Sequence, residues 1–301
     1  MPTLAGSTGD LVRTLVASRP GPAGAIQVGL VGRGIQSSKS PAMHEREARR
    51  LGLDCRYHLL DLDRLGLPDS ALADIVAAAR SLGFAGLNVT HPFKQAVLPL
   101  LDLLSQDAAA IGAVNTLVFK GSIAEGHNTD CWGFAESVRR GLPQAALGRV
   151  VMFGAGGAGA AVARALIDLG ATDLVVVDTD ADRAERLVHR MAATSRGRVF
   201  AERDPAKAMA GTDGVVNATP VGMAKYPGTP VSPDLLDPRH WYADIVYFPP
   251  ETELLLLARA KGCRVLPGAG MAVFQAVRAF ELFTGHASDP AAMVRHFEAA
   301  A

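Results

Sequence analysis

Cysteine is scarce in this sequence, with three residues in a chain of 301. Cys55, Cys131 and Cys263 lie far apart, and the sequence has no CxxC pair and no Cys/His cluster at the spacing of metal ligands. This pattern argues against a disulfide framework and against a metal site. A sparse, odd set of thiols is typical of a reducing compartment, so we expect a cytoplasmic protein without a metal.

Long apolar runs and an excess of charge of one sign are also lacking. No apolar run reaches the roughly 20 residues that a membrane-spanning helix needs, and the short apolar stretch at residues 11–17 contains Arg13. Thirty basic and thirty acidic side chains give a formal charge of zero. Such a chain has no overall field that attracts nucleic acid or an anionic membrane, so we expect neither partner.

What is present is the composition of an ordinary globular protein, 49% hydrophobic and 20% charged, with a length that favours two domains. In the first half, segments typical of strands alternate with segments typical of helices. The predicted strands are residues 25–31, 55–60 and 86–89, and the predicted helices are residues 43–51, 69–82 and 94–104. A predicted hairpin, residues 113–119 and 123–126, follows them. This alternation predicts parallel strands with crossover helices.

A second alternation begins after a helix predicted over residues 129–140. Its predicted strands are residues 150–153, 174–177, 214–217, 242–246 and 264–266, with helices at 181–194 and 253–261 and two more at 271–283 and 290–298. We therefore predict an α/β protein of two domains. Residues 1–129 form a substrate domain with a mainly parallel sheet, residues 130–270 form a Rossmann-type dinucleotide-binding domain, and the helices of residues 271–301 return to the first domain.

A glycine-rich GxGxxG motif follows the strand predicted at residues 150–153 and precedes a helix rich in Ala and Leu. In such a loop the first glycine allows a tight turn, the second lets a diphosphate approach the backbone, and the third allows close packing of helix on strand. The diphosphate then lies at the N-terminus of the helix. The motif predicts a dinucleotide site formed by Gly154, Ala155, Gly156, Gly157, Ala158 and Gly159, the alternative being a glycine-rich turn without a ligand.

The acidic residue Asp178 ends the next predicted strand, at the distance where this fingerprint carries a ribose-binding carboxylate. A carboxylate accepts hydrogen bonds from the ribose hydroxyls and repels a 2′-phosphate, which predicts NAD as the cofactor. For Asp180 we favour a helix N-cap over a ribose contact. Arg183, one helical turn further on, is the first cation after this strand.

Further motifs occur in a fixed order along the chain. They are GIQSSKSPAMH at residues 34–44, NVTHPFK at 88–94, GAVNT at 112–116, GHNTD at 126–130, NATPVGM at 217–223, DIVYFPPETEL at 244–254 and GMAVFQ at 270–275. In order and spacing they resemble the shikimate dehydrogenase family over about residues 29–284. The resemblance implies reversible hydride transfer between a nicotinamide dinucleotide and ring C3 of quinate or shikimate, giving the 3-dehydro acid.

The resemblance also implies a substrate site. Ser38 and Ser40 correspond to a hydroxyl pair that binds the substrate carboxylate, and alternating positions on an extended segment face one way. Ser40 before Pro41 could instead cap the following helix. We expect Lys39, between the two serines, to point away. The other implied substrate-binding residues are Asn88, Thr90, Asn115, Tyr247 and Gln275.

Lys94 and Asp130 correspond to the catalytic pair of the family. Oxidation of an alcohol by hydride loss needs a group that takes the hydroxyl proton, and a lysine oriented by a carboxylate can do so. A structural ion pair is the alternative. On the nicotinamide side the resemblance implies Asn217, Thr219, Gly270 and Met223, with Met271 also near the ring. Both methionines could equally fill the core.

Within the family, the acidic segment at residues 178–180 and the lack of an arginine beside Asp178 favour the NAD-using quinate/shikimate dehydrogenase branch. A biosynthetic NADP-type shikimate dehydrogenase and an aminoshikimate-type enzyme stay open as alternatives. A catalytically silent Rossmann protein that senses a nucleotide is the non-enzyme alternative, and a methylenetetrahydrofolate dehydrogenase-like protein is disfavoured by the serine motif. We expect a monomer or homodimer.

Overall fold

The computed structural model describes residues 7–300 and divides into two compact units. Unit 1 holds the chain up to Thr129 together with the residues from Ala276 onward, and unit 2 is Asp130–Gln275. The two divisions fall at the start of helix α6 (Thr129–Gly141) and within helix α11 (Ala269–Thr284). Among residues 7–300, no helix is both long and apolar enough to cross a membrane.

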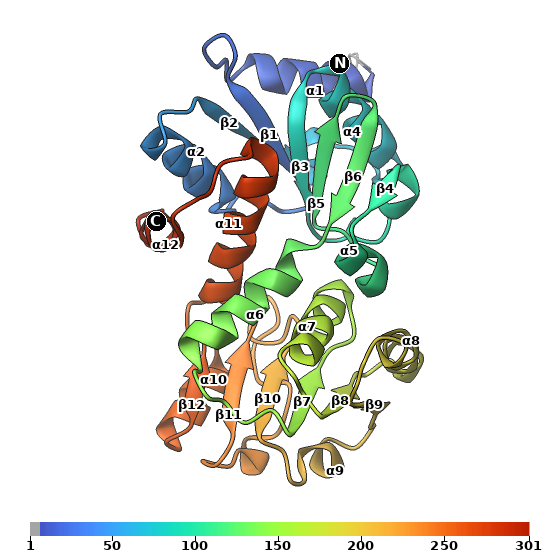
Figure 1. Ribbon diagram of the computed structural model, residues 1–301, viewed down its shortest axis with the longest axis vertical. Helices are drawn as coiled ribbons and strands as arrows, with labels where there is room; N and C mark the ends of the chain where they lie inside the picture. Colours follow the sequence, from blue (N-terminus) through green and yellow to red (C-terminus); the bar gives the residue numbers. More distant parts are fainter. Residues whose placement is uncertain (1–6, 301) are drawn as a thin grey trace. The chain divides into compact units, whose positions relative to one another are not determined.

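Unit 1 contains a six-stranded sheet (Figure 1). Its strands, in spatial order, are β2 (Cys55–Asp61), β1 (Ile26–Gly32), β3 (Phe84–Val89), β5 (Thr116–Lys120), β6 (Ile123–His127) and β4 (Leu103–Leu104). Strand β1 pairs in parallel with both β2 and β3, whereas β3, β5 and β6 pair antiparallel. The predicted parallel strands and the predicted hairpin are therefore both present.

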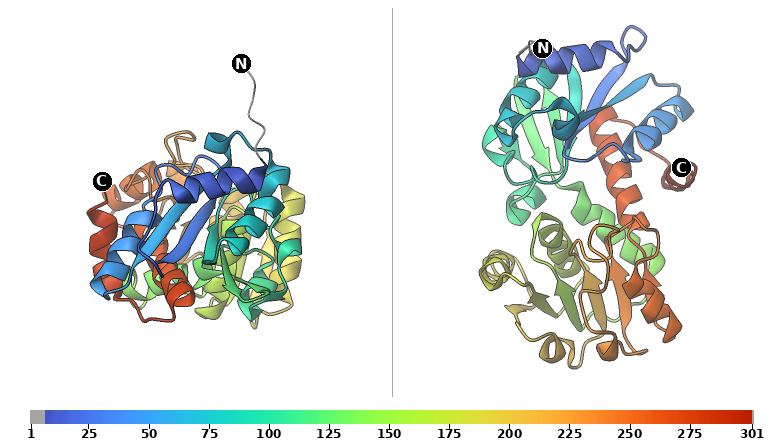
Figure 2. Two further views of the ribbon diagram at one scale, coloured as in Figure 1. Left: turned by 90° about the horizontal axis from the view of Figure 1, so that it is seen from above. Right: turned by 180° about the vertical axis from the view of Figure 1, so that it is seen from behind.

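Helices cover the sheet of unit 1. They are α1 (Thr8–Ala17), α2 (Ser40–Arg50), α3 (Leu62–Leu65), α4 (Leu72–Ser81), α5 (Gln106–Ile111), the last part of α11 and α12 (Pro290–Glu298), with the short 3₁₀ helices η1 (Asp69–Ala71) and η2 (Leu98–Leu100). Helix α1 packs against α4, and the C-terminal α12 packs against α2 (Figure 2). Leu60, Leu87 and Phe93 belong to the core that these elements enclose.

The helix predicted over residues 94–104 is wrong. The segment forms turns, η2 and the short strand β4. Pro99 has no backbone N–H and cannot continue an α-helical hydrogen-bond pattern. The end of the segment is instead tied to β6, because the backbone N–H of Asp102 donates to the Ala124 carbonyl at 2.9 Å. Lys94 consequently lies on a turn.

Unit 2 contains a parallel sheet of six strands. In spatial order they are β12 (Arg264–Leu266), β11 (Trp241–Asp244), β10 (Gly214–Asn217), β7 (Arg149–Phe153), β8 (Asp173–Val177) and β9 (Arg198–Ala201). The chain winds one way from β7 through β9 and the other way from β10 through β12. Such an order is the doubly wound Rossmann arrangement that the sequence predicts, and its switch point lies between β7 and β10.

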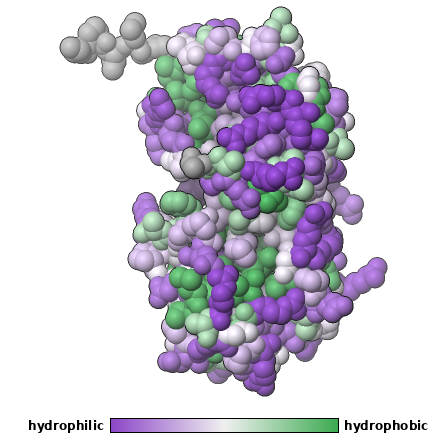
Figure 3. Space-filling model, turned by 90° about the vertical axis from the view of Figure 1, so that its left-hand side faces the viewer, coloured by the Kyte–Doolittle hydropathy of each residue, from purple (hydrophilic) through white to green (hydrophobic). Residues whose placement is uncertain are grey.

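The helices of unit 2 are α6, α7 (Gly157–Asp168), α8 (Ala181–Ala192), α9 (Pro205–Met209), α10 (Glu253–Ala260) and the first part of α11, with the 3₁₀ helix η3 (Pro233–Leu235). Val151, Val175 and Tyr242 are fully buried in its core. Strand β9 and helix α9 were missed by the sequence analysis. On the face drawn in Figure 3, hydrophilic side chains predominate and hydrophobic ones form smaller patches between them.

Candidate active site

The loop after β1 is held by a buried carboxylate. Asp61, at the end of β2 and 2% exposed, accepts hydrogen bonds from the backbone N–H groups of Gly34 and Ile35, both at 3.1 Å, and from the Gln36 side chain at 2.9 Å. Burial opposes ionisation of Asp61, but these hydrogen bonds outweigh it and lower its pKa. Sequence reasoning missed Asp61, although its place at the end of a predicted strand was a signal.

Ser38 and Ser40 lie beyond this loop, at the start of α2, and both are half-buried. The Ser38 hydroxyl oxygen accepts from the backbone N–H of Ser40 at 3.3 Å, which leaves the Ser38 hydroxyl hydrogen for another acceptor. The N-cap of α2 is Lys39, so the alternative in which Ser40 caps the helix is wrong; Ser40 is its first residue. The ammonium of Lys39 donates to the carbonyl of Phe297 in α12 at 3.2 Å.

A buried network of polar side chains joins β3 to the segment before α6. Asn88, 6% exposed, donates through Nδ2 to Thr116 Oγ1 at 3.0 Å. Asn115, 3% exposed, accepts from the Thr129 backbone N–H at 2.7 Å and donates to Thr129 Oγ1 at 2.9 Å. The two predicted substrate-binding asparagines are thus held rigidly, with both amides oriented by neighbours inside unit 1.

The backbones of Lys94 and Asp130 are fixed by the same region. The carbonyl of Lys94 accepts from the backbone N–H of Val114 at 2.8 Å, and Asn115 is the next residue. Because Asn115 holds Thr129, it fixes the residue directly before Asp130. Thr90 begins the turn that carries Lys94, and its N–H donates to the Val31 carbonyl of β1 at 3.0 Å. Unit 1 therefore brings Ser38, Ser40, Asn88, Thr90, Lys94 and Asn115 to the edge where β1 and β3 end.

In unit 2, Asp130 lies in the first turn of α6 and is 6% exposed. Desolvation, and then the negative charge of Asp130, raise the pKa of Tyr247, which places this tyrosine within electrostatic reach of the carboxylate. Helices α6 and α11 pack closely at Gly133, where a Cβ would lie 2.6 Å from the backbone nitrogen of Gln275. Tyr247 is therefore within reach of the charge of Asp130, and separately the backbone of Gln275 in α11 lies against α6 at Gly133.

The three glycines of the GxGxxG loop differ in their surroundings. Gly154 has φ +102°, and its Cβ would lie 2.6 Å from the carbonyl oxygen of Ala218. A Cβ on Gly159 would lie 2.2 Å from the carbonyl oxygen of Gly154. Around Gly156, the N-cap of α7, the part of the chain that the structure describes has no atom within 4 Å of such a Cβ. The loop thus has the open backbone at a helix N-terminus that fits a diphosphate.

The carboxylate of Asp178, whose side chain is 6% exposed, braces this loop. It accepts from the Ala155 backbone N–H at 2.7 Å and from that of Asp180 at 2.8 Å. Asp180 is the N-cap of α8, as predicted, and accepts from the backbone N–H of Arg183 at 3.0 Å. The guanidinium of Arg183 lies 3.1 Å from Asp180 and 3.8 Å from Asp178, so two carboxylates face this cation. The expectation that no arginine lies beside Asp178 is therefore wrong, because the first turn of α8 brings Arg183 back to the end of β8.

The loop after β10 depends on a buried amide–carboxylate pair. Asn217 is fully buried; it donates to Asp244 at 3.0 Å and accepts from the Thr219 hydroxyl at 2.7 Å. Burial raises the pKa of Asp244 to about 6, against hydrogen bonds from Thr252, Asn217 and Val246 that lower it. The side chain of Asn217 therefore shapes the loop that carries half-buried Thr219. The sequence analysis missed Asp244 as a site residue, although it opens one of the quoted motifs.

The remaining predicted cofactor-side residues differ in exposure. Met223 is 42% exposed, whereas Met271 is 8% exposed and packs in the manner of a core residue. Gly270 lies against α6, because a Cβ there would be 2.2 Å from the Ser137 hydroxyl oxygen. Its lack of a side chain is explained by this helix contact within unit 2.

A doubly wound parallel sheet with a glycine loop at its switch point, joined to a second α/β unit, defines a two-domain α/β protein with a Rossmann-type dinucleotide-binding unit. A family model described as the shikimate dehydrogenase substrate binding domain matches residues 30–117. A relative from Streptomyces avermitilis, named shikimate dehydrogenase (NADP(+)), is 54% identical over 270 residues, covering 89% of this chain and 93% of its own. The chain belongs to the shikimate dehydrogenase family.

Two further similar proteins are named for NAD or were solved in complex with it. Quinate/shikimate dehydrogenase (NAD(+)) of Corynebacterium efficiens is 48% identical, covering 86% of this chain and 93% of its own. The structure of quinate dehydrogenase from Corynebacterium glutamicum in complex with NAD superimposes with a TM-score of 0.86 at 46% identity, covering 91% of this chain and 99% of the other. The family and a nicotinamide dinucleotide cofactor are therefore shown, and relatives of both cofactor types are similar to this chain.

Proposed function

We propose that this protein oxidises the C3 hydroxyl of quinate or shikimate, reversibly, with NAD as its preferred cofactor. The observation that carries the proposal is the network joining the motif residues of unit 1: the Lys94 carbonyl is held by Val114, and Asn115 holds Thr129 directly before Asp130. This network fixes the backbones of a lysine and a carboxylate that could serve one proton transfer. In this assignment residues 1–129 and 271–301 form the substrate domain and residues 130–270 the dinucleotide-binding domain.

The residues of unit 2 fit a dinucleotide. The open space around Gly156 admits a diphosphate, and the N-terminus of the twelve-residue helix α7 supplies a favourable dipole. Asp178, at the end of β8, holds Ala155 and has the position that suits an adenosine ribose. We assign the remaining loop residues Gly154, Gly157, Ala158 and Gly159, together with Thr219, Met223 and Gly270, to the same cofactor.

When bound, the nicotinamide ring supplies the hydride acceptor. The protein's part in the oxidation is to bind, orient and take a proton. Lys94 Nζ accepts the proton of the reacting hydroxyl, and Asp130 orients the lysine. The Ser38 hydroxyl, whose oxygen already accepts from Ser40, donates to the substrate carboxylate together with the Ser40 hydroxyl. Thr90 binds a ring hydroxyl, and Asn88, Asn115 and Gln275 bind hydroxyls and the carboxylate of the substrate. Tyr247 lies near the substrate carboxylate.

The preference for NAD is supported by the charges around the ribose position. A 2′-phosphate there would meet Asp178 and Asp180, and Arg183 faces both carboxylates. The alternative, a biosynthetic NADP enzyme, is favoured by the 54% identity to the relative named for NADP. An arginine beside a 2′-phosphate binds it strongly, but Arg183 is already paired with Asp180 at 3.1 Å, and this pairing supports the preference for NAD.

One assay tests the proposed function. The purified protein is mixed at alkaline pH with quinate, shikimate or an aminated analogue, and with NAD or NADP, and formation of the reduced dinucleotide is followed. We expect reduction of NAD by quinate or shikimate. If no acid reduces either dinucleotide, the proposed function is wrong. If NADP is reduced much faster than NAD, the protein is still a dehydrogenase, but the cofactor assignment is wrong.

A further inference from the structure

Tyr57 on strand β2 is bonded to Asn88, one of the proposed substrate-binding residues. Its side chain is fully buried, and its hydroxyl donates to Asn88 Oδ1 at 2.8 Å. Burial raises the pKa of this phenol. The Tyr57 hydroxyl therefore contacts directly a side chain that is assigned above to the substrate.

The hydrogen-bond directions at this oxygen follow from the surroundings of Asn88. Its Nδ2 lies 3.0 Å from Thr116 Oγ1 and 3.3 Å from the Asn115 carbonyl. A carbonyl oxygen only accepts, so turning the Asn88 amide round would set two acceptors against each other. The Asn88 oxygen must then face Tyr57, which donates to it.

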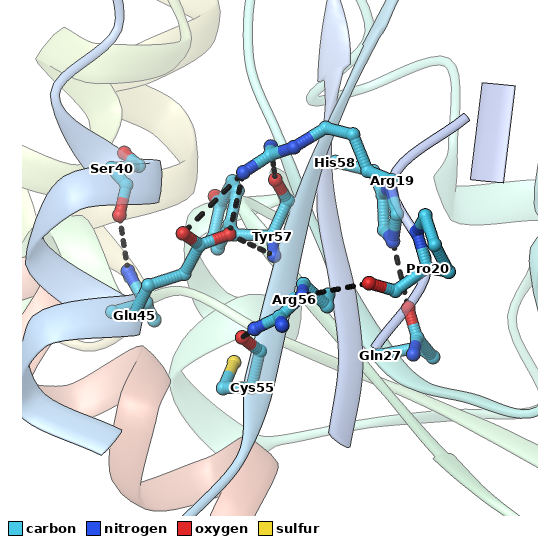
Figure 4. Close-up of polar contacts among 10 residues, drawn as sticks. Arg19, Pro20, Gln27, Ser40, Glu45, Cys55, Arg56, Tyr57 and His58 are labelled. Carbon is cyan, nitrogen blue, oxygen red and sulfur yellow. Dashed lines mark hydrogen bonds and ion pairs between the residues drawn. The ribbon is translucent and has the colours of Figure 1, made fainter. Parts of the chain in front are cut away.

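The backbone of Tyr57 is clamped from outside the sheet (Figure 4). Strand β2 is an edge strand, so Tyr57 needs partners other than a neighbouring strand on that side. Its N–H donates to Glu45 in α2 at 2.9 Å, and its carbonyl accepts from Arg19 at 2.9 Å. Arg19 and Glu45 also form an ion pair at 3.1 Å. The ring packs on His44, with centroids 4.8 Å apart, which leaves the hydroxyl little freedom.

We propose that Tyr57 is a positioning residue of the substrate site, acting through Asn88. The inference rests on the proposed function. Tyr57 keeps the carbonyl oxygen of Asn88 oriented, so Asn88 offers the substrate a hydrogen-bond acceptor. Loss of the Tyr57 hydroxyl would leave this oxygen without its donor.

The test is Tyr57→Phe, which keeps the ring and removes the hydroxyl. We expect the KM for quinate or shikimate to rise about tenfold, with kcat within about threefold and the KM for the dinucleotide unchanged. The matched control is Tyr242→Phe, because Tyr242 is equally buried and its hydroxyl oxygen accepts from the backbone N–H of Asp237 in the core of unit 2. This control should leave the KM for the acid unchanged.

A double-mutant cycle with Asn88→Ala separates positioning from general loosening. If Tyr57 acts through Asn88, the KM increase in the double variant falls clearly short of the product of the single increases. An unchanged KM in folded Tyr57→Phe, or increases that simply multiply, would overturn the proposal. If thermal unfolding shows that Tyr57→Phe does not fold, Arg19→Met, on the surface, takes its place. It should raise the same KM, and an unchanged value would again overturn the proposal.

The outcome also separates this inference from the proposed function. If the wild-type protein reduces no dinucleotide with either acid, both the proposed function and the inference on Tyr57 are wrong. A wild-type protein that oxidises quinate or shikimate, with a Tyr57→Phe variant of unaltered KM, would end the inference on Tyr57 alone.

Discussion

The carboxylate of Asp178 accepts a hydrogen bond from the backbone N–H of Ala155 at 2.7 Å. The end of β8 is thereby tied to the glycine loop that follows β7. An acidic residue at this position has two separable effects: it supports the loop, and it sets the charge next to the ribose position. Substitutions can be chosen that change the second effect and retain most of the first.

Asp178→Asn is such a substitution, since an amide oxygen can still accept from Ala155. In the wild-type protein kcat/KM with NAD should exceed that with NADP by at least about 100-fold, since one charge repulsion and two lost hydrogen bonds amount to roughly 3 kcal/mol. The ratio should fall at least tenfold in Asp178→Asn, by about 1.4 kcal/mol. The control is Asp182→Asn, an exposed acid in the same segment. Equal efficiency with both cofactors in the wild-type protein would show the assignment to be wrong.

Two glycines of the loop should respond in opposite ways to alanine. Gly159→Ala places a Cβ 2.2 Å from the Gly154 carbonyl oxygen, so the unfolding temperature should drop by several degrees. Gly156→Ala meets no atom of the described chain within 4 Å, so its stability should be unchanged while its Kd for the dinucleotide rises at least about tenfold. Thermal unfolding and calorimetric titration measure the two quantities. Unaltered dinucleotide binding by Gly156→Ala would place the diphosphate elsewhere.

The serine pair should act on binding. Ser38→Ala or Ser40→Ala should raise the KM for quinate or shikimate by a factor of about 5 to 30. This factor corresponds to the binding free energy of one hydrogen bond to a charged group. Ser37→Ala, at the exposed neighbouring position, should leave it unchanged. Steady-state kinetics at saturating dinucleotide measure the effect. A lowered kcat with an unchanged KM would mean that these hydroxyls lie beside the reacting carbon instead.

A buried histidine should make stability depend on pH. Burial, and then the charges of Arg19 and Arg56, lower the pKa of His58 to about 4, and within residues 7–300 its Nδ1 has no hydrogen-bond partner. Because the folded-state pKa lies below the unfolded one, the stabilisation is fully present above about pH 6.5. It is lost as the pH falls toward 4 and is already down by on the order of 2 kcal/mol at pH 5.

The measurement is the free energy of unfolding at pH 7 and pH 5 for the wild-type protein and for His58→Gln. The difference between the two pH values should shrink in the variant. His286→Gln, which changes an exposed histidine, should retain the wild-type difference. A variant with the full wild-type pH dependence would show that His58 is not the group responsible.

The sequence predicted those parts of the fold that rest on local pattern. Helix Pro290–Glu298 occurs at the predicted residues, because apolar periodicity marks it and Asp289 and Pro290 stand at its start. Strand Arg264–Leu266 also occurs at the predicted residues, as a short segment after the turn residue Gly262. Strand Arg198–Ala201 was missed because it is a short edge strand whose side chains are mostly half-buried. The helix predicted at residues 94–104 is absent because Pro99 has no backbone N–H to donate. The prediction followed the spacing of apolar residues and gave this missing donor too little weight.

The candidate site, like the fold, was predicted only where a local sequence pattern marks the residues. The resemblance of the motifs predicted Asn88 and Asn115 as site residues, but the residues that hold the predicted site in place act through contacts between segments distant in sequence. Asp61 braces the loop at Gly34, 27 positions away, and Asp244 holds Asn217 across the same separation. A single sequence contains no local signal for such pairings, because they depend on the order of strands in each sheet.

The central claim is that Lys94 takes the proton of the substrate hydroxyl. The most direct measurement is the pH profile of kcat for oxidation by Lys94→Ala, with Lys120→Ala, an exposed lysine paired with Glu125, as the control. We expect kcat of Lys94→Ala to fall at least about 100-fold, with dinucleotide affinity nearly unchanged and the rise of the rate with pH abolished. Retention of a third or more of the wild-type turnover with an unaltered pH profile would contradict the account and make the lysine structural.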